Sequence, residues 1–469
     1  MDLSTQNTLR NSEWGFAALL YFLSWGWMIF LQDPLWDDWI LLNSSSAELL
    51  SEPDPRMPVY ALMGLLPNPV LGYHLATFFC YFGAGILFVQ ILQRIQHFPR
   101  GYEFPALLLF WLLPLNIARI ACINFPYALS LLLFLAGFRL WIHPTKGVHK
   151  IWAPLLFIFS FMTPSFLVLF YAVAGVLVFQ NSSNLARFRK EAAYTLFLCS
   201  VPIIAWLIRA NYFQPQGVYA EYYALSLEKI GAAPWLSLKV LVKNFLEGVS
   251  FFIHPYISGF TLLLLGALFA LTHIGVLPKI LPQSGSDKLS WKGIGVGFFL
   301  LLAGVFPYVA IGKEPGFSDW LSRHQLLMSP GLSILIISLG SFLSAHWFRG
   351  MLLLILSGSL SLNIFFAWEW KNDMIRREEI AAQIRQASIP DSICTVLLHF
   401  PEENGLARNR HLRFYEIMGI IKEKNRLWKG AYFPEPPGIP KNLEFYQNSR
   451  YFLEGYHPEW CDSLHLNIH

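Results

Sequence analysis

Residues 151–179 read IWAPLLFIFSFMTPSFLVLFYAVAGVLVF, an apolar run that is too long for one upright membrane helix. A spanning helix needs about 20 apolar residues. Thr163-Pro164-Ser165 interrupts the middle of the run, and a proline removes a backbone donor and clashes with the preceding turn. Two interpretations follow: one tilted, kinked helix, or two short helices that form a hairpin.

The basic residues around this run favour the hairpin. With the N-terminus in the cytoplasm, the loops that carry Arg94 and Lys146 face the cytoplasm, where Lys and Arg concentrate. The later basic clusters join them only if residues 151–179 turn back on themselves. A single crossing would place all of these later residues outside: Arg187, Arg189, Lys190, Lys279, Lys288, Lys292 and Arg349.

The composition agrees with a membrane protein, because hydrophobic residues make up 55% of the chain and charged residues only 14%. The net charge of +4 does not indicate nucleic-acid binding, since the basic residues form short clusters between apolar runs. We therefore expect an all-α polytopic membrane protein with about 11 membrane segments, some short or broken. The apolar runs lie near residues 14–32, 70–93, 104–122, 124–142, 151–179, 192–212, 249–275, 292–311, 326–347 and 350–370.

The chain divides at about residue 370, so that residues 1–370 form the membrane domain. The tail, residues 371–469, lacks apolar runs, and its acids and bases roughly balance, as in a water-exposed domain. We expect this tail to be a small extracytoplasmic α/β domain in which Cys394 and Cys461 could form a disulfide. Its pattern predicts helices over 373–388 and 411–425, a strand over 392–400, and an irregular stretch beyond Ala431.

An acidic and aromatic segment, Trp36-Asp37-Asp38-Trp39, follows the first apolar run. A carboxylate just outside the hydrocarbon can act as general base toward an acceptor hydroxyl. Alternatively, Asp37 and Asp38 could hold a divalent cation through their oxygens. A simpler interpretation is that one of the two acids caps the helix that begins near Trp39.

A second polar loop, residues 312–325, lies between two later runs. Arg323 and Lys313 suit a phosphate or pyrophosphate, and His324 could hydrogen-bond the phosphate or carry a proton. The alternative for Arg323 is an ion pair with Asp319 within one helical turn. Arg56, after the proline-rich Glu52-Pro53-Asp54-Pro55, serves either a phosphate or a pair with Asp54.

The segment 213–248 carries Tyr219, Glu221 and Tyr222, followed by an amphipathic stretch. Clustered tyrosines beside one acid suit a sugar or acceptor surface, because the ring faces pack and the hydroxyls form hydrogen bonds. A helix that lies on the membrane surface without touching a substrate fits the same pattern. On the expected topology this segment, both polar loops and the tail all face outward.

One outward acidic loop, many short or broken spans and an outer C-terminal domain together resemble the GT-C superfamily of integral-membrane glycosyltransferases. This resemblance implies a polyprenyl-phosphate-linked sugar as donor and an essential acid in the first outer loop, matched here by Asp37 and Asp38. It also implies that Arg323 contacts the lipid-linked phosphate. The tail does not clearly match a carbohydrate-binding module.

We therefore expect a multi-pass protein of the cytoplasmic membrane that transfers a sugar, with inversion, to a glycan, lipid or protein acceptor of the cell envelope, such as a surface polysaccharide. The sequence names no cofactor beyond a possible divalent cation at the aspartates. One alternative is a transporter or flippase, although transporters usually place charge near the bilayer midplane. A scaffold subunit of an envelope complex is the other alternative.

Overall fold

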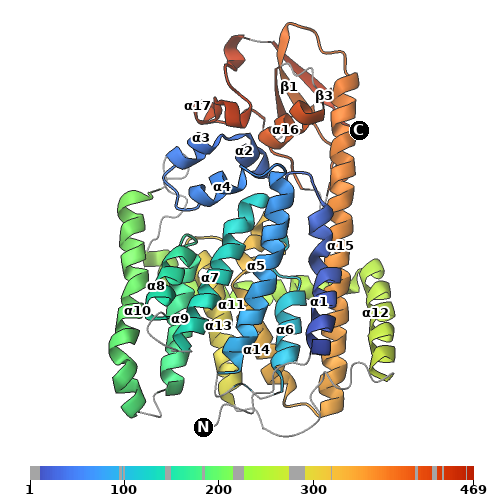
Figure 1. Cartoon of the computed structure of the whole chain (residues 1–469). Helices are drawn as coiled ribbons and strands as arrows, with labels where there is room; N and C mark the ends of the chain where they lie inside the picture. Colours follow the sequence, from blue (N-terminus) through green and yellow to red (C-terminus); the bar gives the residue numbers. More distant parts are fainter. Residues whose placement is uncertain are drawn as a thin grey trace.

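The computed structural model describes residues 11–94, 98, 101–142, 149–181, 185–214, 227–273, 291–317, 319–406, 410–424, 430–435, 438–460 and 462–469. Most helices form a bundle, and the three strands lie beyond one end of it (Figure 1). The helices before residue 182 are α1 (Asn11–Trp25), α2 (Asp38–Asn43), α3 (Ser46–Ser51), α4 (Met57–Met63), α5 (Pro69–Leu92), α6 (Glu103–Leu112), α7 (Phe125–Ile142), α8 (His149–Ser160) and α9 (Ser165–Asn181). The later ones are α10 (Leu185–Tyr212), α11 (Leu227–Ile253), α12 (Pro255–His273), α13 (Trp291–Val309), α14 (Met328–Gly340), α15 (Ala345–Gln386), α16 (Phe414–Lys424) and α17 (Leu443–Tyr446).

The long run 151–179 is a hairpin made of α8 and α9. Helix α7 runs antiparallel to α8. Phe138, late in α7, contacts Phe157 of α8, whereas Ser130, earlier in α7, donates a hydrogen bond to Thr163 just after α8. The same helix runs parallel to α9, because Phe134 contacts Phe166 and Phe138 contacts Phe170. Helices α8 and α9 are therefore antiparallel to each other, and the chain turns at Thr163-Pro164 as expected.

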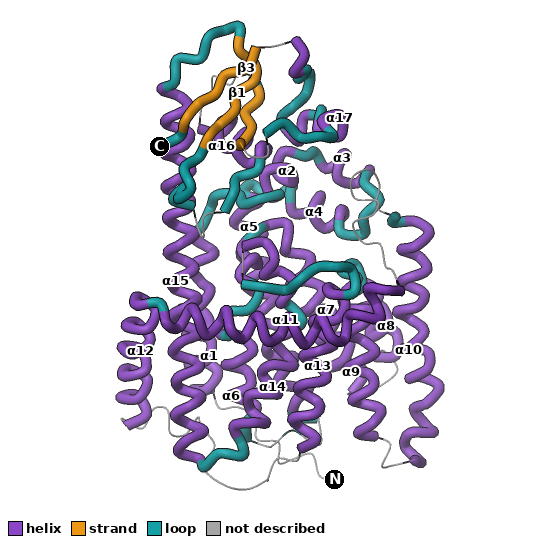
Figure 2. The backbone as a smooth tube through the Cα atoms, turned by 180° about the vertical axis from the view of Figure 1, so that it is seen from behind, coloured by secondary structure: helices purple, strands orange, loops and turns teal. Residues whose placement is uncertain are grey.

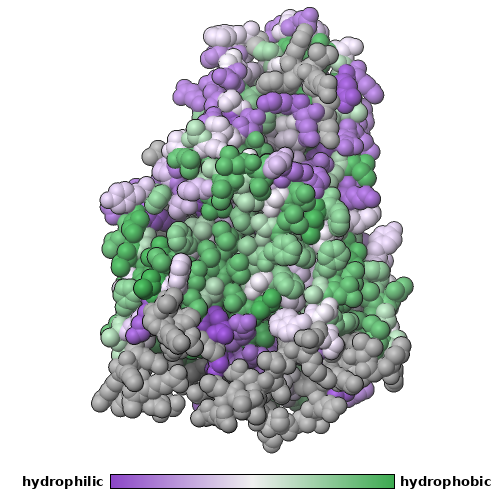
Figure 3. All heavy atoms as spheres, viewed as in Figure 1, coloured by the Kyte–Doolittle hydropathy of each residue, from purple (hydrophilic) through white to green (hydrophobic). Residues whose placement is uncertain are grey.

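Helices long and apolar enough to cross a membrane are fewer than the 11 segments expected. Among the described residues there are five, or up to six if α11 and α12 are counted as one bent span. The count of about 11 is therefore not confirmed. On the face that Figure 3 shows, apolar side chains cover the middle of the bundle and polar ones gather over the tail, as in a polytopic α-helical membrane protein. The five are Pro69–Leu92, Cys122–Ile142, Ala192–Tyr212, Trp291–Val309 and Ala345–Gln386.

Several expected runs are shorter helices. Helices α6, α8, α9 and α14 are apolar but have only 10–17 residues within the described chain. Helix α11 lies across the other helices of the bundle (Figure 2) and is bent by 81° from α12. Its position agrees with the amphipathic helix that the sequence predicts before residue 248.

Helices α13 and α14 pack with their backbones in contact, which brings the residues between them close to the bundle. A Cβ atom added at Gly331 would lie 2.4 Å from the backbone nitrogen of Leu301. One added at Gly304 would lie 2.5 Å from the backbone oxygen of Leu327. Small residues allow this close approach of helices in membranes. The pair therefore fixes both ends of the loop that holds Arg323 and His324.

The tail contains a parallel three-stranded sheet in the order β2-β1-β3. Strand β1 (Ile393–His399) agrees with the expected strand, and α16 agrees with the expected second helix. The expectation of an irregular stretch beyond Ala431 is wrong, because that stretch forms β2 (Ala431–Glu435) and β3 (Asp462–Asn467). Both strands are short, and they are held by pairing with β1 rather than by a strong local pattern.

The expected helix 373–388 is the end of α15, which continues from the last apolar run without a break. The expected boundary at residue 370 thus lies within one helix. Each part has its own hydrophobic core, and the smaller core joins the tail to Trp39 of the first loop. Cys394 is disulfide-bonded, whereas Cys461 lies outside the described residues.

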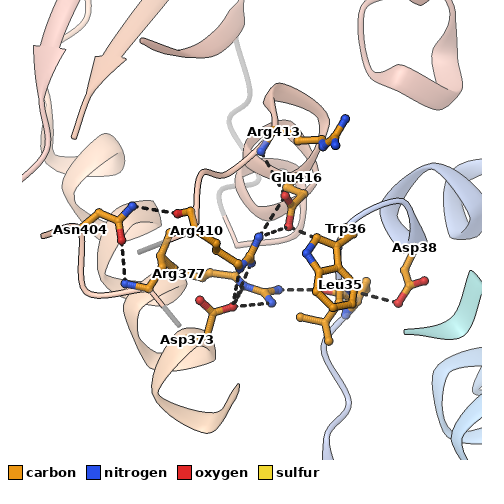
Figure 4. A network of polar contacts seen from close by, with 11 residues as sticks. Leu35, Trp36, Asp38, Asp373, Arg377, Asn404, Arg410, Arg413 and Glu416 are labelled. Carbon is orange, nitrogen blue, oxygen red and sulfur yellow. Dashed lines mark hydrogen bonds and ion pairs between the residues drawn. The ribbon is translucent and has the colours of Figure 1, made fainter. Parts of the chain in front are cut away.

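A buried network of charges fixes the tail to the first loop (Figure 4). Asp373 of α15 accepts hydrogen bonds from Arg377, at 3.0 Å, and from Arg410, at 2.9 Å. Arg410 also donates to Glu416, which accepts further hydrogen bonds from the backbone N–H groups of Trp36 and Arg413. These four charged side chains are almost completely buried. Since the partners come from α15, the tail and the first loop, the network holds all three together.

Candidate functional site

Asp38 is buried, and its carboxylate joins the first loop to the bundle. One oxygen accepts hydrogen bonds from the backbone N–H groups of Leu35 and Cys122, at 3.1 and 2.9 Å. The other accepts one from the N–H of Ile123, at 2.8 Å. Burial raises the pKa of Asp38 to about 7, although the three N–H donors oppose this shift. Asp38 therefore positions the loop, and both of its oxygens are occupied.

Asp37 is only partly buried and accepts a hydrogen bond from the hydroxyl of Tyr415 in the tail. It is also the residue before α2, but its side chain makes no capping hydrogen bond. A divalent cation does not fit this pair, because backbone N–H groups point at both oxygens of Asp38 and would repel a positive charge. The interpretation of Asp37 and Asp38 as metal ligands therefore has no support in the geometry.

The first loop and the loop that holds Arg323 meet through aromatic rings. Trp36 packs edge-on against Trp320, with 5.0 Å between the ring centroids. On the same ring, the guanidinium of Arg323 lies 3.9 Å from the centroid. Arg323 is thus linked to the first loop through the ring of Trp320 rather than through Asp37 or Asp38. The side chain of Asp319, the alternative partner of Arg323, lies outside the described residues.

The segment η6 (Asp319–Gln325) is fixed from two sides. The hydroxyl of Ser322 accepts a hydrogen bond from the backbone N–H of Ala118, at 2.9 Å. The side chain of Gln325 accepts one from the N–H of Asn116 and donates another to Asn244 of α11. These buried contacts give His324, which lies between Ser322 and Gln325, a defined position.

A cavity of about 630 Å³ opens next to His324, between α9, α10 and α13. Prolines lie in or beside these helices at the cavity wall, namely Pro164, Pro202 and Pro307. Because proline interrupts helical hydrogen bonding and bends the helix, these residues help to separate the helices here. The apolar part of the wall includes Leu167, Val168, Ile203, Trp206, Ile230, Phe306 and Ile311.

Among the described residues, the charged side chains that line the cavity are all cationic. Arg56, Arg209 and Lys313 line it together with His324. Arg56 also pairs with Asp54, with 2.6 Å between Nη2 and Oδ2. Burial opposes ionisation of Asp54, but the adjacent Arg56 keeps its pKa below the ordinary value. Arg56 therefore forms the pair with Asp54, and it also lines the cavity.

His324 is the most informative residue of this cavity. Both ring nitrogens are buried, and neither has a hydrogen-bond partner among the residues that the structure describes. The ring lies against Tyr308, with 4.7 Å between centroids. Burial, Arg323 and Lys313 together hold the pKa of His324 well below its ordinary value, so the imidazole is neutral. A buried polar group without a partner is costly, and an incoming ligand that hydrogen-bonds it would remove that cost.

Lys313 reaches the cavity from the turn that ends α13. Gly312 has a φ of +78°, and the N–H of Lys313 bonds the carbonyl of Tyr308, as at many helix C-termini. Burial lowers the pKa of Lys313 to about 7, and the nearby Arg323 and Arg56 add to this effect. The cavity wall thus carries the cationic side chains of Arg56, Arg209 and Lys313, which would attract an anion.

Of the expected site residues, the structure brings Arg56, Lys313 and His324 together in one cavity. Asp37, Asp38 and Arg323 are not among the described residues that line it. Tyr219, Glu221 and Tyr222 lie outside the described residues. Sequence reasoning missed Arg209 and Tyr308, which both line the cavity. The sequence places Arg209 near the end of an apolar run, before the polar segment 213–248, but it does not show that this side chain faces a cavity.

Comparison with known proteins gives one structural likeness. No family model matches the chain, and no curated protein matches it. Among solved structures, the crystal structure of ArnT from Cupriavidus metallidurans bound to undecaprenyl phosphate is similar over 96% of this chain and 88% of that chain. The sequence identity is 11% and the TM-score is 0.30. At these values the likeness carries no conclusion about the activity of this chain.

Proposed function

We propose that this protein is a membrane glycosyltransferase whose cavity binds the phosphate of a polyprenyl-phosphate-linked sugar. The observation that carries this proposal is His324, whose two buried nitrogens have no partner among the described residues, in a cavity lined by cations. A phosphate supplies negative charge beside the cations and a hydrogen-bond acceptor for His324. It would raise the pKa of His324 and let the imidazolium donate to a phosphate oxygen.

The apolar wall suits the lipid part of such a donor. Val168, Ile203 and Phe306 come from three different helices and line the same cavity as the cations. A charged headgroup beside an apolar wall is the arrangement that an amphipathic lipid needs at a membrane surface. A soluble phosphate compound would gain nothing from contacts with these side chains.

For the transfer step, we propose Asp37 as the general base. It is partly exposed, and the hydrogen bond from Tyr415 reaches only its Oδ1, whereas both oxygens of Asp38 accept from backbone donors. Because Asp37 does not line the cavity, the sugar of the donor would have to extend from the cavity to the first loop. The acceptor hydroxyl would lose its proton to Asp37 while its oxygen attacks the anomeric carbon of the sugar. The bond from that carbon to the phosphate oxygen then breaks, and the phosphate leaves with the electron pair. The cations of the cavity would stabilise the charge on the departing phosphate. Attack opposite the leaving group inverts the sugar carbon.

The binding part of the proposal can be tested with His324→Phe in purified full-length protein. Phenylalanine keeps a ring to pack on Tyr308 but has no nitrogen to hydrogen-bond a phosphate. We expect the affinity for undecaprenyl phosphate to fall by roughly 10- to 100-fold, the value of one hydrogen bond to a charged group. The matched control is His346→Phe on an exposed position of α15, which should leave the affinity unchanged.

Phosphatidylglycerol provides the second arm of this experiment, because any phospholipid carries a phosphate. Equal affinity for both lipids would mean that the cavity recognises an ordinary membrane phosphate, and the polyprenyl part of the proposal would be wrong. If neither lipid binds more strongly to the wild type than to His324→Phe, the cavity is not a phosphate site.

The transfer step needs its own measurement. Asp37→Asn is compared with the wild type in purified enzyme supplied with a lipid-linked sugar and envelope acceptors. We expect loss of transfer with unchanged binding of undecaprenyl phosphate. Full transfer by Asp37→Asn would exclude its role as base without affecting the phosphate site.

A further inference from the structure

Three potential metal ligands lie at one edge of the tail sheet, far along the chain from the cavity residues. His399 ends β1 and pairs in register with Glu435, which ends β2. His465 of β3 pairs with Leu397, two residues before His399. Residues two apart on a strand face the same side of a sheet, so the three side chains share one face. The sheet therefore brings together two imidazoles and one carboxylate from three separate strands.

Their ligand atoms converge on one point. Nε2 of His399 lies 2.7 Å from Nδ1 of His465 and 3.1 Å from Oε2 of Glu435. The remaining distance, from Nδ1 of His465 to Oε2 of Glu435, is 3.3 Å. Around a tetrahedral Zn²⁺ with ligand bonds of about 2.0–2.1 Å, ligand atoms are separated by about 3.3 Å. Small side-chain movements would therefore admit an ion between them.

Glu435 gives a second observation that points to a ligand. Its Oε2 atom is buried and has no hydrogen bond of acceptable geometry within the described part of the chain, although both imidazoles are within 3.3 Å. The two rings are stacked with 19° between their planes, and His465 is the most exposed of the three. A metal at this point would satisfy the carboxylate oxygen and leave a fourth position open to water.

We propose that His399, Glu435 and His465 form a transition-metal site of the Zn²⁺ type that clamps β1, β2 and β3 together. Two imidazole nitrogens and one carboxylate oxygen suit Zn²⁺ and its neighbours in the first transition row, whereas Mg²⁺ and Ca²⁺ prefer oxygen ligands alone. The disulfide-bonded Cys394 lies on the same strand as His399. A metal at the far end of β1 would therefore add a second cross-link to this strand.

The test is Zn²⁺ binding by the full-length protein in detergent after removal of metal with a chelator. We expect one equivalent of Zn²⁺ per chain, a rise in melting temperature with Zn²⁺, and no such rise with Mg²⁺. His465→Ala should weaken Zn²⁺ binding at least about 100-fold, because it removes a metal ligand. Removing a residue that only hydrogen-bonds a ligand usually costs about 10- to 100-fold. Glu435→Gln keeps the shape of the side chain and should also weaken Zn²⁺ binding. This second variant still tests the site if His465→Ala fails to fold.

The matched control is His457→Ala. In the same tail, Nδ1 of His457 lies 3.3 Å from Oε1 of Glu459. This histidine–carboxylate pair has no third metal-ligating side chain beside it among the described residues. This variant should bind Zn²⁺ like the wild type. A wild type that binds no more Zn²⁺ than the double variant His399→Ala/His465→Ala would overturn the proposal. In that case the three side chains form only a hydrogen-bonded, ion-paired cluster. Equal losses of Zn²⁺ affinity in His457→Ala and His465→Ala would lead to the same conclusion.

Discussion

The indole ring of Trp36 lies edge-on against that of Trp320, with 5.0 Å between their centroids. This contact joins two loops that are almost 300 residues apart in the chain, and Arg323 stacks on the same Trp320 ring. The first loop therefore supports the segment that presents His324 to the cavity. Asp38 does not line the cavity, so its own influence on the candidate site acts through packing.

Substitution of Asp38 by asparagine should destabilise the protein. In the variant, the amide NH₂ would face a backbone N–H that now donates a hydrogen bond to the carboxylate. One buried group left without a hydrogen bond costs about 1–3 kcal/mol of stability. Thermal unfolding in detergent measures this loss. Asp37→Asn is the control on the adjacent, partly exposed position and should melt close to the wild type.

The same carboxyl group predicts a pH dependence of stability. The native state keeps the proton of Asp38 up to about pH 7, whereas the unfolded chain loses it near its ordinary value of 3.8. Because the folded pKa is raised, the contribution of Asp38 to the free energy of unfolding is greatest below pH 4 and falls as pH rises to about 7, by up to about 4 kcal/mol. The difference in melting temperature between wild type and Asp38→Asn should change across this range. A constant difference from pH 4 to pH 7 would contradict the raised pKa.

Lys313 predicts a pH dependence of ligand binding. Its pKa is about 7 in the empty cavity, so the ammonium that attracts an anion is lost as pH rises above this value. The affinity for undecaprenyl phosphate should therefore decrease between pH 6.5 and pH 8.5. Lys313→Arg is the matched control, because arginine stays charged throughout. An identical pH profile for both proteins would show that Lys313 does not contribute to binding.

The close contact of α13 with α14 predicts opposite results for two glycines. Gly331→Ala places a Cβ 2.4 Å from the backbone of Leu301 and should cost about 1–3 kcal/mol by overpacking. Gly295→Ala, at a position with open space in the same pair of helices, should be neutral or slightly stabilising. Melting temperatures of the two variants decide this. Similar losses in both would mean that the helices are not packed as described.

The buried charges that fix the tail should tolerate little change. Arg410→Met leaves Asp373 and Glu416 short of a partner, and breaking a buried ion pair typically costs about 3–5 kcal/mol. The control is Glu379→Gln, which removes the more exposed pair with Arg376 and should cost less than about 1 kcal/mol. Limited proteolysis should cleave the tail of Arg410→Met sooner than that of the wild type, because its attachment to α15 and the first loop is weakened.

The parts of this fold that the sequence predicts are those with strong local signals. Pro164 in the middle of an overlong apolar run predicts the turn between α8 and α9, and the distribution of Lys and Arg selects the hairpin. Strand β1 and helix α16 are predicted because their apolar residues repeat at regular intervals. Short strands β2 and β3 were missed, since parallel pairing with β1 depends on residues distant in the chain.

The candidate site was predicted in part for the same reason. Arg56, Lys313 and His324 stand out as polar residues in loops, and the cavity contains all three. Arg209 lies within a helix, and a sequence does not say which face of that helix meets a cavity. The burial of Asp38 was also missed, because it depends on the backbone of Cys122 and Ile123, more than 80 residues away.

Helix α15 has a consequence for the rest of the molecule. Its 42 residues extend for about 63 Å, roughly twice the hydrocarbon thickness of a bilayer. A single unbroken helix carries both the last apolar run and the acid that receives Arg410. The number of residues between these two parts therefore sets the rotation of the tail about the helix axis. Deleting one of them would turn Asp373 by about 100° and remove it from its partners, even though no contact residue had been replaced.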